Sequence, residues 1–173
     1  MRVNQEQREA GRGLDPIAEA MRLWEDHGWK DAALGMAAVT SLMRAQQLVL
    51  SRVETVLKPF AITFARYEVL MLLVFSVRGS LPMGTIGARL QVHPTSVTNA
   101  VDRLESAGLV ERLAHPSDRR ATLVAITADG RAVADEATAT LNDEVFGRLG
   151  LTTSDTRSLI GVLTRLRADA GDF

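Results

Sequence analysis

The sequence predicts a mainly α-helical fold with one β-hairpin. Three observations support this prediction: apolar residues recur every three or four positions over long stretches, capping residues stand at the ends of those stretches, and one pair of short segments alternates in polarity. Of the 173 residues, 46% are hydrophobic and 24% are charged, as in ordinary globular proteins. No repeat or low-complexity tract divides the chain, so we expect a single domain over residues 1-173.

Two helices are expected in the first third of the chain. Asp15 and Pro16 are typical of a helix start, and Gly28 is typical of a helix end. A much longer helix is expected from residue 31 to residue 58, where Pro59 stops it. Its apolar residues follow a heptad spacing over a length greater than one small core requires. We therefore expect this helix to serve the core and also to brace a partner subunit.

The sequence predicts four further helices, in addition to the helix over residues 94-106. The apolar run 69-75 should lie in the middle of the core, on a helix that follows Thr63. A short helix is expected over residues 82-90. Thr127 is a typical N-cap for a helix that continues to about residue 148, and Thr152 is one for a final helix that ends near residue 168.

The helix over residues 94-106 has one apolar face, which must pack inward, and one polar face. Its polar side chains are small or hydrogen-bonding, which suits a helix that enters the major groove of DNA: hydroxyls reach phosphates or bases, and Asn pairs with adenine. An ordinary amphipathic helix with a solvated outer face has the same pattern, so the pattern alone does not decide between the two. The polar residues are Thr95, Ser96, Thr98, Asn99, Asp102 and Arg103.

A β-hairpin with a long basic tip is expected next. Residues 109-114 and 121-126 alternate in polarity, and the tip between them places Arg119 and Arg120 beside Asp118. An arginine on a protruding ribbon can enter the minor groove, where the potential is negative. We expect Asp118 to hold one of the two arginines and to stiffen the tip. A solvated loop is the alternative, but it explains neither the length of the tip nor the paired arginines.

Three segments stand in the order and spacing of a known family. They read SVTNAVDRLESAGLVER, PSDRR and ITADG, all within residues 62-130. This stretch resembles the multiple-antibiotic-resistance regulator (MarR) family of winged helix-turn-helix transcription factors. The resemblance implies an obligate-type homodimer in which residues 62-126 form the winged DNA-binding lobe. The helices within 14-60 and 127-173 would then be the dimerisation helices.

The resemblance implies a sequence-specific regulator, a repressor, that binds a pseudopalindromic operator as a homodimer. The alternative is a winged-helix protein-interaction module without DNA binding. Carried over position by position, the residues that the resemblance places against DNA are Thr95, Ser96, Thr98, Asn99 and Arg103 on the helix, with Asp118, Arg119 and Arg120 on the wing.

The resemblance also implies release of DNA by a small molecule, often an aromatic acid or phenol, bound between the dimer region and the DNA-binding lobe. Trp24 is the candidate for an aromatic wall, Arg44 or Arg66 for an anion partner, and Tyr67 or Glu68 for polar contacts. Each also has a plain structural interpretation, as a core anchor or a surface residue. A urate-responsive branch of the family fits Trp24 and Glu68 only loosely, because that branch has Asp where Glu68 stands.

Several other classes of function lack support in the sequence. The three histidines are far apart and form no ligand pair, and no phosphate loop or nucleophile elbow occurs, so we expect neither an enzyme nor a cofactor. The absence of cysteine excludes disulfides, thiolate catalysis and the cysteine-based peroxide sensing of one branch of the family. The longest apolar run, 69-75, is far shorter than the roughly 20 residues of a membrane span, so we expect a cytoplasmic protein without membrane contact.

Overall fold

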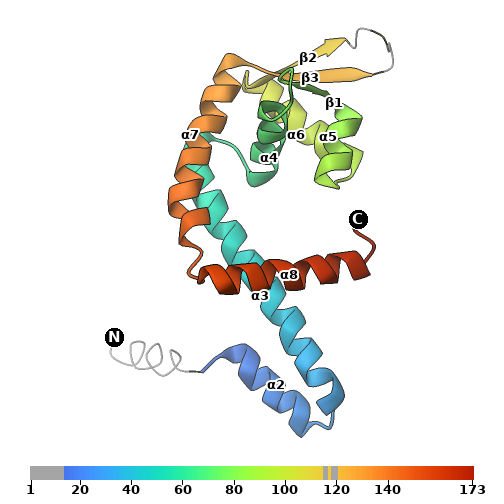
Figure 1. Ribbon diagram of the computed structural model, residues 1–173, viewed down its shortest axis with the longest axis vertical. Helices are drawn as coiled ribbons and strands as arrows, with labels where there is room; N and C mark the ends of the chain where they lie inside the picture. The colour runs from blue at the N-terminus through green and yellow to red at the C-terminus, as the bar shows by residue number, and fades with distance from the viewer. Residues whose placement is uncertain (1–13, 115–116, 118–120) are drawn as a thin grey trace, which may run out of the picture. The chain divides into compact units, whose positions relative to one another are not determined.

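The computed structural model describes residues 14–114, residue 117 and residues 121–173 (Figure 1). The chain divides into two compact units, one that ends at Ser51 and one that runs from Arg52 to Phe173. Among the described residues, no helix is both long enough and apolar enough to cross a lipid bilayer.

The first unit contains helix α2 (Pro16–Asp26) and most of helix α3 (Lys30–Leu57). The predicted start of α2 is confirmed, because the Asp15 carboxylate accepts a hydrogen bond from the backbone N–H of Ile17 at 3.0 Å. Gly28 follows α2 with φ +88°, a left-handed conformation that glycine adopts without strain. Ala33 is the one buried residue among residues 14–51 of this unit, so α3 here exposes its heptad of apolar side chains to solvent.

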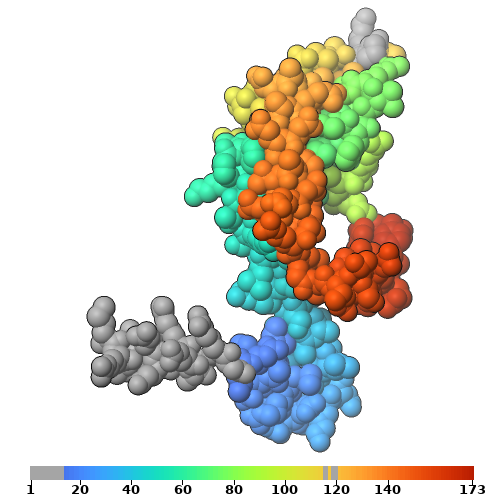
Figure 2. All heavy atoms as spheres, turned by 60° about the vertical axis from the view of Figure 1, so that its left-hand side comes forward, coloured from blue at the N-terminus to red at the C-terminus, as the bar shows by residue number. Residues whose placement is uncertain are grey.

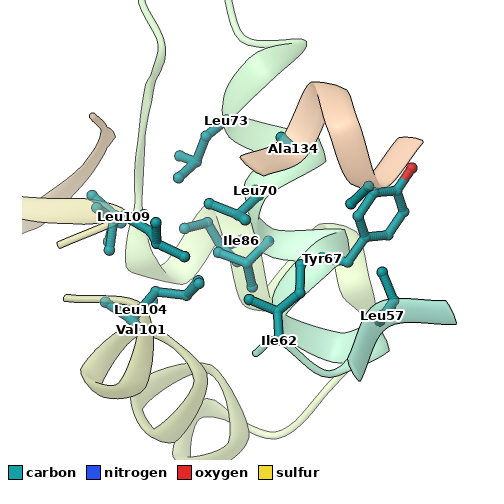
Figure 3. Packing of buried hydrophobic residues seen from close by; sticks show 14 of the residues in the cluster. Leu57, Ile62, Tyr67, Leu70, Leu73, Ile86, Val101, Leu104, Leu109 and Ala134 are labelled. Carbon is teal, nitrogen blue, oxygen red and sulfur yellow. The ribbon is translucent and has the colours of Figure 1, made fainter. Parts of the chain in front are cut away.

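The second unit is built around helix α4 (Phe64–Val74). The predicted place of the apolar run in the core is confirmed for Val69, Leu70 and Leu73, which are fully buried. Phe75, the last residue of that run, is instead 74% exposed, because it forms the C-cap of α4 and lies beyond the packed turns. Figure 3 shows α4 side chains meeting apolar residues of the neighbouring helices, including Ile86. A short 3-10 turn, η1 (Lys58–Phe60), joins α3 to α4.

Helices α5 (Met83–Leu90) and α6 (Pro94–Ser106) form the helix-turn-helix. The predicted bounds of α6 are confirmed, whereas α5 begins one residue later than predicted because Pro82 is its N-cap. The turn between them begins at Gln91, which ends α5 in a left-handed conformation, φ 54°. The apolar face of α6 packs on α4 and α5. Its buried residues are Val97, Val101 and Leu104.

The sheet has three strands where the sequence predicts one hairpin. The hairpin itself is present, with β2 (Val110–Ala114) antiparallel to β3 (Thr122–Ile126). The additional strand is β1 (Ser80–Pro82), which pairs antiparallel with the other side of β3 and gives the order β1-β3-β2 (Figure 1). Periodicity could not reveal β1, because three residues are too few to alternate and Pro82 disfavours a strand.

Two helices follow the sheet, α7 (Ala128–Glu144) and α8 (Thr153–Asp169), with the 3-10 turn η2 (Phe146–Arg148) between them. The predicted caps are confirmed, since the hydroxyls of Thr127 and Thr152 accept hydrogen bonds from the first turns of α7 and α8. The helix predicted to reach residue 148 ends earlier. Figure 2 shows α8 (red) projecting from the end of α7 (orange), and no residue of α8 is buried.

Candidate nucleic-acid interface

The orientation of α6 is fixed by its buried face. Val97, Val101 and Leu104 are each at most 2% exposed, and they recur at helical spacing. Because these three side chains are locked in the core, the opposite side of the helix must face solvent. All of the polar residues that the sequence places on that side are exposed. The structure therefore brings Thr95, Ser96, Thr98, Asn99, Asp102 and Arg103 onto one surface.

Some polar side chains on this surface are already hydrogen-bonded within the chain, and others are not. The Thr98 hydroxyl donates to the carbonyl of Pro94 at 3.1 Å, and the Thr95 hydroxyl lies 3.1 Å from Nδ1 of His93. Within the described part of the chain, the side chains of Ser96 and Asn99 make no hydrogen bond. These two side chains are therefore available to a ligand, which suits base-edge or phosphate contacts.

A hollow of about 640 Å³ runs along this surface, between α6 and the start of α4. Arg66, which the sequence offered as an effector ligand, lines this hollow together with Arg103 and Asn99. The two guanidinium groups outnumber the one carboxylate of the lining, Asp102, which is paired with Arg112, so the hollow suits a phosphate backbone. The residues that line it are Thr63, Ala65, Arg66, Ser96, Asn99, Ala100, Asp102, Arg103 and Ser106.

Arg112 on strand β2 ties the wing to α6, a role that the sequence reasoning missed. Its guanidinium donates to the Asp102 carboxylate at 2.6 Å and also to the Glu105 carboxylate, whose other oxygen accepts from the Arg112 backbone N–H at 3.2 Å. Partial burial lowers the pKa of Arg112, but hydrogen bonds and charge attraction from the two carboxylates raise it overall. The available signal was a cation at an inward-facing position of the strand, preceded by two carboxylates three positions apart on the helix.

The remaining predicted DNA contacts are Arg103 on α6 and three residues at the tip of the wing. Arg103, which the resemblance places against DNA, lines the hollow, and the residue that links α6 to β2 is Arg112. Asp118, Arg119 and Arg120 lie outside the described residues, so their roles at the wing tip stay predictions.

The predicted effector residues are divided between the two units. Trp24 and Arg44 belong to the first unit, where the Trp24 ring meets the Trp29 ring edge-on at 5.1 Å. Arg66 belongs to the second unit. The joint site that the sequence suggested stays a prediction.

Two predicted effector residues of the second unit, Tyr67 and Glu68, have different surroundings. Tyr67 is buried, and its hydroxyl is hydrogen-bonded to the Thr138 hydroxyl at 2.9 Å, which is the position of a core residue. Glu68 is half-buried, and this burial raises the pKa of its carboxyl. No cluster of side chains suited to a metal occurs among the described residues.

Comparisons with known proteins agree on one family. The profile of the MarR family matches residues 62–122. A crystal structure of Sco5413, a MarR family transcriptional regulator from Streptomyces coelicolor, is 50% identical in sequence. The alignment covers 80% of this chain and 96% of that one, with a TM-score of 0.73. Sco3205, a MarR family transcriptional regulator from the same organism that was crystallised in complex with DNA, is 28% identical over 77% of this chain and 84% of that one, with a TM-score of 0.66.

Curated relatives match over a shorter stretch. YhbI, an uncharacterised HTH-type transcriptional regulator of Bacillus subtilis, is 35% identical over 86 residues. This match covers 49% of this chain and 53% of that protein. The chain thus spans about half the length of the curated relatives that it matches.

Proposed function

Because the chain belongs to the MarR family of transcriptional regulators, we propose that it binds operator DNA through α6 and the wing. Its membership in a family of regulators agrees with the prediction that it is not an enzyme. The single observation that carries the proposal is the outer face of α6, where Ser96 and Asn99 are exposed and unengaged while the inner face is locked in the core. Asp118, Arg119 and Arg120 would add the wing contact.

The polar face suits a major groove for three physical reasons. Its side chains are short near the helix start, so the backbone can approach the bases, and Asn99 can pair bidentately with adenine. Arg66 and Arg103 in the adjoining hollow can neutralise phosphates on one side of the helix. Arg112 holds the wing against the same helix, so that both elements reach DNA as one rigid piece.

We further propose that the regulator is a homodimer that reads a pseudopalindromic operator as a repressor. Two copies of α6 would have to stand about 34 Å apart to enter successive major grooves. The proposal is supported by apolar side chains that one chain leaves in solvent, such as Met43 on α3 and Ile160 on α8, each 60% exposed. A second copy would cover them.

The proposed signal is a small organic acid or phenol that releases the DNA. Arg66 supports this proposal, because an anion bound there would lie beside Asn99 and Arg103 and would compete with the operator. Trp24, Arg44, Tyr67 and Glu68 remain candidates for the rest of the site. Fluorescence of the two tryptophans, titrated with salicylate and urate, tests it together with displacement of operator DNA. If neither acid changes the fluorescence or releases DNA, the proposal of an aromatic-acid signal fails.

Fluorescence anisotropy on two duplexes tests the DNA-binding proposal. One duplex carries the region upstream of the protein's own gene, and the other is random DNA. Asn99→Ala should weaken binding to the operator by on the order of 1–3 kcal/mol and to random DNA much less, as expected for a base contact. Asn142→Ala is the matched control, because Asn142 is an exposed asparagine on α7, away from α6.

Two results would revise this assignment. An equal loss on both duplexes would reassign Asn99 to the phosphate backbone. Failure of the unsubstituted protein to bind either duplex would favour the winged-helix interaction module instead.

A further inference from the structure

The turn of the helix-turn-helix carries a histidine, His93, at the N-cap position of α6. We propose that His93 is a positioning residue: its neutral imidazole holds the first turn of α6 in the conformation that reads DNA, and protonation of the ring releases that turn. The inference rests on the proposed function, since it concerns the helix that would enter the major groove.

The hydrogen bonds of the first turn show why this ring matters. Pro94 has no N–H, and the N–H groups of Ser96 and Val97 donate to the backbone carbonyl of His93 at 2.9 and 3.3 Å. The remaining N–H of the turn belongs to Thr95, and it donates to Nδ1 of the His93 ring at 3.2 Å. The ring is thus the one acceptor that the structure gives to this N–H.

The acceptor role requires one form of the ring. A nitrogen that accepts a hydrogen bond carries no proton, so this hydrogen bond needs the neutral ring with its proton on Nε2. Protonation would convert Nδ1 into a donor, which can still contact the Thr95 hydroxyl at 3.1 Å but leaves the Thr95 backbone N–H without its acceptor. It would also place a positive charge at the positive end of the α6 dipole. Both effects disfavour the first turn, which presents Thr95 and Ser96.

The charged groups around this turn do not offset that loss. Arg89 is the one charged side chain of α5, and as a cation it offers an imidazolium no compensating charge. On α6 the Asp102 carboxylate is paired with Arg112 at 2.6 Å. The C-terminal segment reaches the turn through a hydrogen bond from the Gln91 side chain to the Asp172 carbonyl, and the Asp172 carboxylate is paired with Arg167 at 2.6 Å.

No ion pair of His93 occurs in the described part of the chain. Protonation of the ring would therefore remove the capping hydrogen bond, and no ion pair would offset its loss.

The first experiment needs no DNA. In the full-length protein, nitrogen-15 NMR follows the Thr95 amide and the His93 ring from pH 8 to pH 5.5. We expect the Thr95 amide to shift with the same midpoint as the ring, and to stay pH-independent in His93→Asn, because asparagine caps a helix without titrating. A Thr95 amide that does not follow the ring in the unsubstituted protein would overturn the proposal.

The second experiment asks whether the cap positions the helix for DNA. Between pH 7.5 and pH 5.5, operator affinity of the unsubstituted protein should fall about fivefold more than that of His93→Asn, which is the factor expected from loss of one N-cap. His93→Ala should bind weakly at both pH values, and His93→Asn should restore binding. His27→Asn is the matched control, because His27 lies in the first unit and its loss should leave the pH profile unchanged.

The outcomes separate the two proposals. Identical pH profiles of the unsubstituted protein and His93→Asn would overturn the positioning role even if the NMR midpoints agree. Absence of operator binding by every variant at every pH would overturn the proposed function, while the NMR titration would still decide whether His93 holds the turn.

Discussion

The proposed DNA-binding lobe (residues 62–126) and helix α8 differ in how they bury their apolar side chains. In the lobe, α6 buries three apolar residues completely against its own chain. Helix α8 buries none, and its apolar residues Leu159, Val162 and Leu166 stay substantially exposed on one face. An amphipathic helix gains stability chiefly by covering its apolar face. The comparison indicates that one chain completes the packing of residues 62–126 by itself, and we expect a second copy of the chain to cover α8.

The largest expected effect comes from charging the exposed face of α8. Leu159→Glu combined with Leu166→Glu should convert a dimer into a monomer of 18.8 kDa, because two carboxylates would be buried in the interface. Operator affinity should fall by roughly 10²–10⁴-fold as the two half-sites lose their linkage. Sedimentation at micromolar concentration and DNA binding measure both effects.

The control for this experiment is Thr164→Glu, which adds a charge to the exposed polar side of the same helix. It should leave the mass and the affinity unchanged. A double variant that remains dimeric with full affinity would mean that α8 does not lie in the dimer interface.

The next prediction tests how closely the start of α7 packs against the residues that flank the hairpin. Gly130→Ala should lower the free energy of unfolding by on the order of 1–3 kcal/mol, because an added Cβ would overlap the carbonyl oxygen of Leu109 and lie 2.9 Å from the Ile126 side chain. Gly84→Ala is the matched control at an exposed position of α5, with nothing within 4 Å of the new methyl group. It should raise stability by about 0.5–1 kcal/mol. Urea unfolding that ranks the two variants equally would contradict the close packing at Gly130.

A smaller effect is expected where the wing meets α6. Arg112→Ala should destabilise the protein by about 1 kcal/mol, because the carboxylates it frees are half in solvent. Operator affinity should fall more than stability alone explains, since the wing would no longer be held against α6. Glu111→Ala is the control on the outward side of the same strand. Equal operator binding by the two variants would show that the wing needs no brace.

The smallest effect concerns the half-buried carboxyl of Glu68. Burial raises its pKa in the folded state, so ionisation at neutral pH disfavours folding, and stability should increase as the pH falls through the raised pKa. Glu68→Gln should therefore stabilise the protein at pH 7 by less than about 1 kcal/mol, because solvent weakens the penalty. The gain should vanish at acidic pH. Thermal unfolding at pH 7 and pH 4 measures it, and a gain independent of pH would assign the effect to packing.

The features that the sequence predicted are those encoded over short distances along the chain. The spacing of Val97, Val101 and Leu104 alone determines which side of α6 faces outward, and Thr127 and Thr152 mark helix starts through local hydrogen bonds. The same reasoning correctly placed Asn99 on the exposed side.

The features that the sequence did not predict depend on partners far along the chain. Strand β1 exists through its pairing with β3, more than 40 positions away. Tyr67, considered as a ligand contact, is held by Thr138, 71 positions away. Arg112 differs, because its partners Asp102 and Glu105 are near in the sequence. Its role was open to prediction from the inward-facing position of a charged residue on a strand.

The order of the sheet has a consequence for solubility. A protruding hairpin presents unpaired backbone groups along its edges, and such edges invite other chains to add strands. Here β3 is the central strand, and its second edge is covered by β1, which is only three residues long and ends in Pro82. A strand this short, with a proline that cannot donate a hydrogen bond, is a poor template for further pairing. The wing can therefore extend from the lobe without offering that side of its sheet to aggregation.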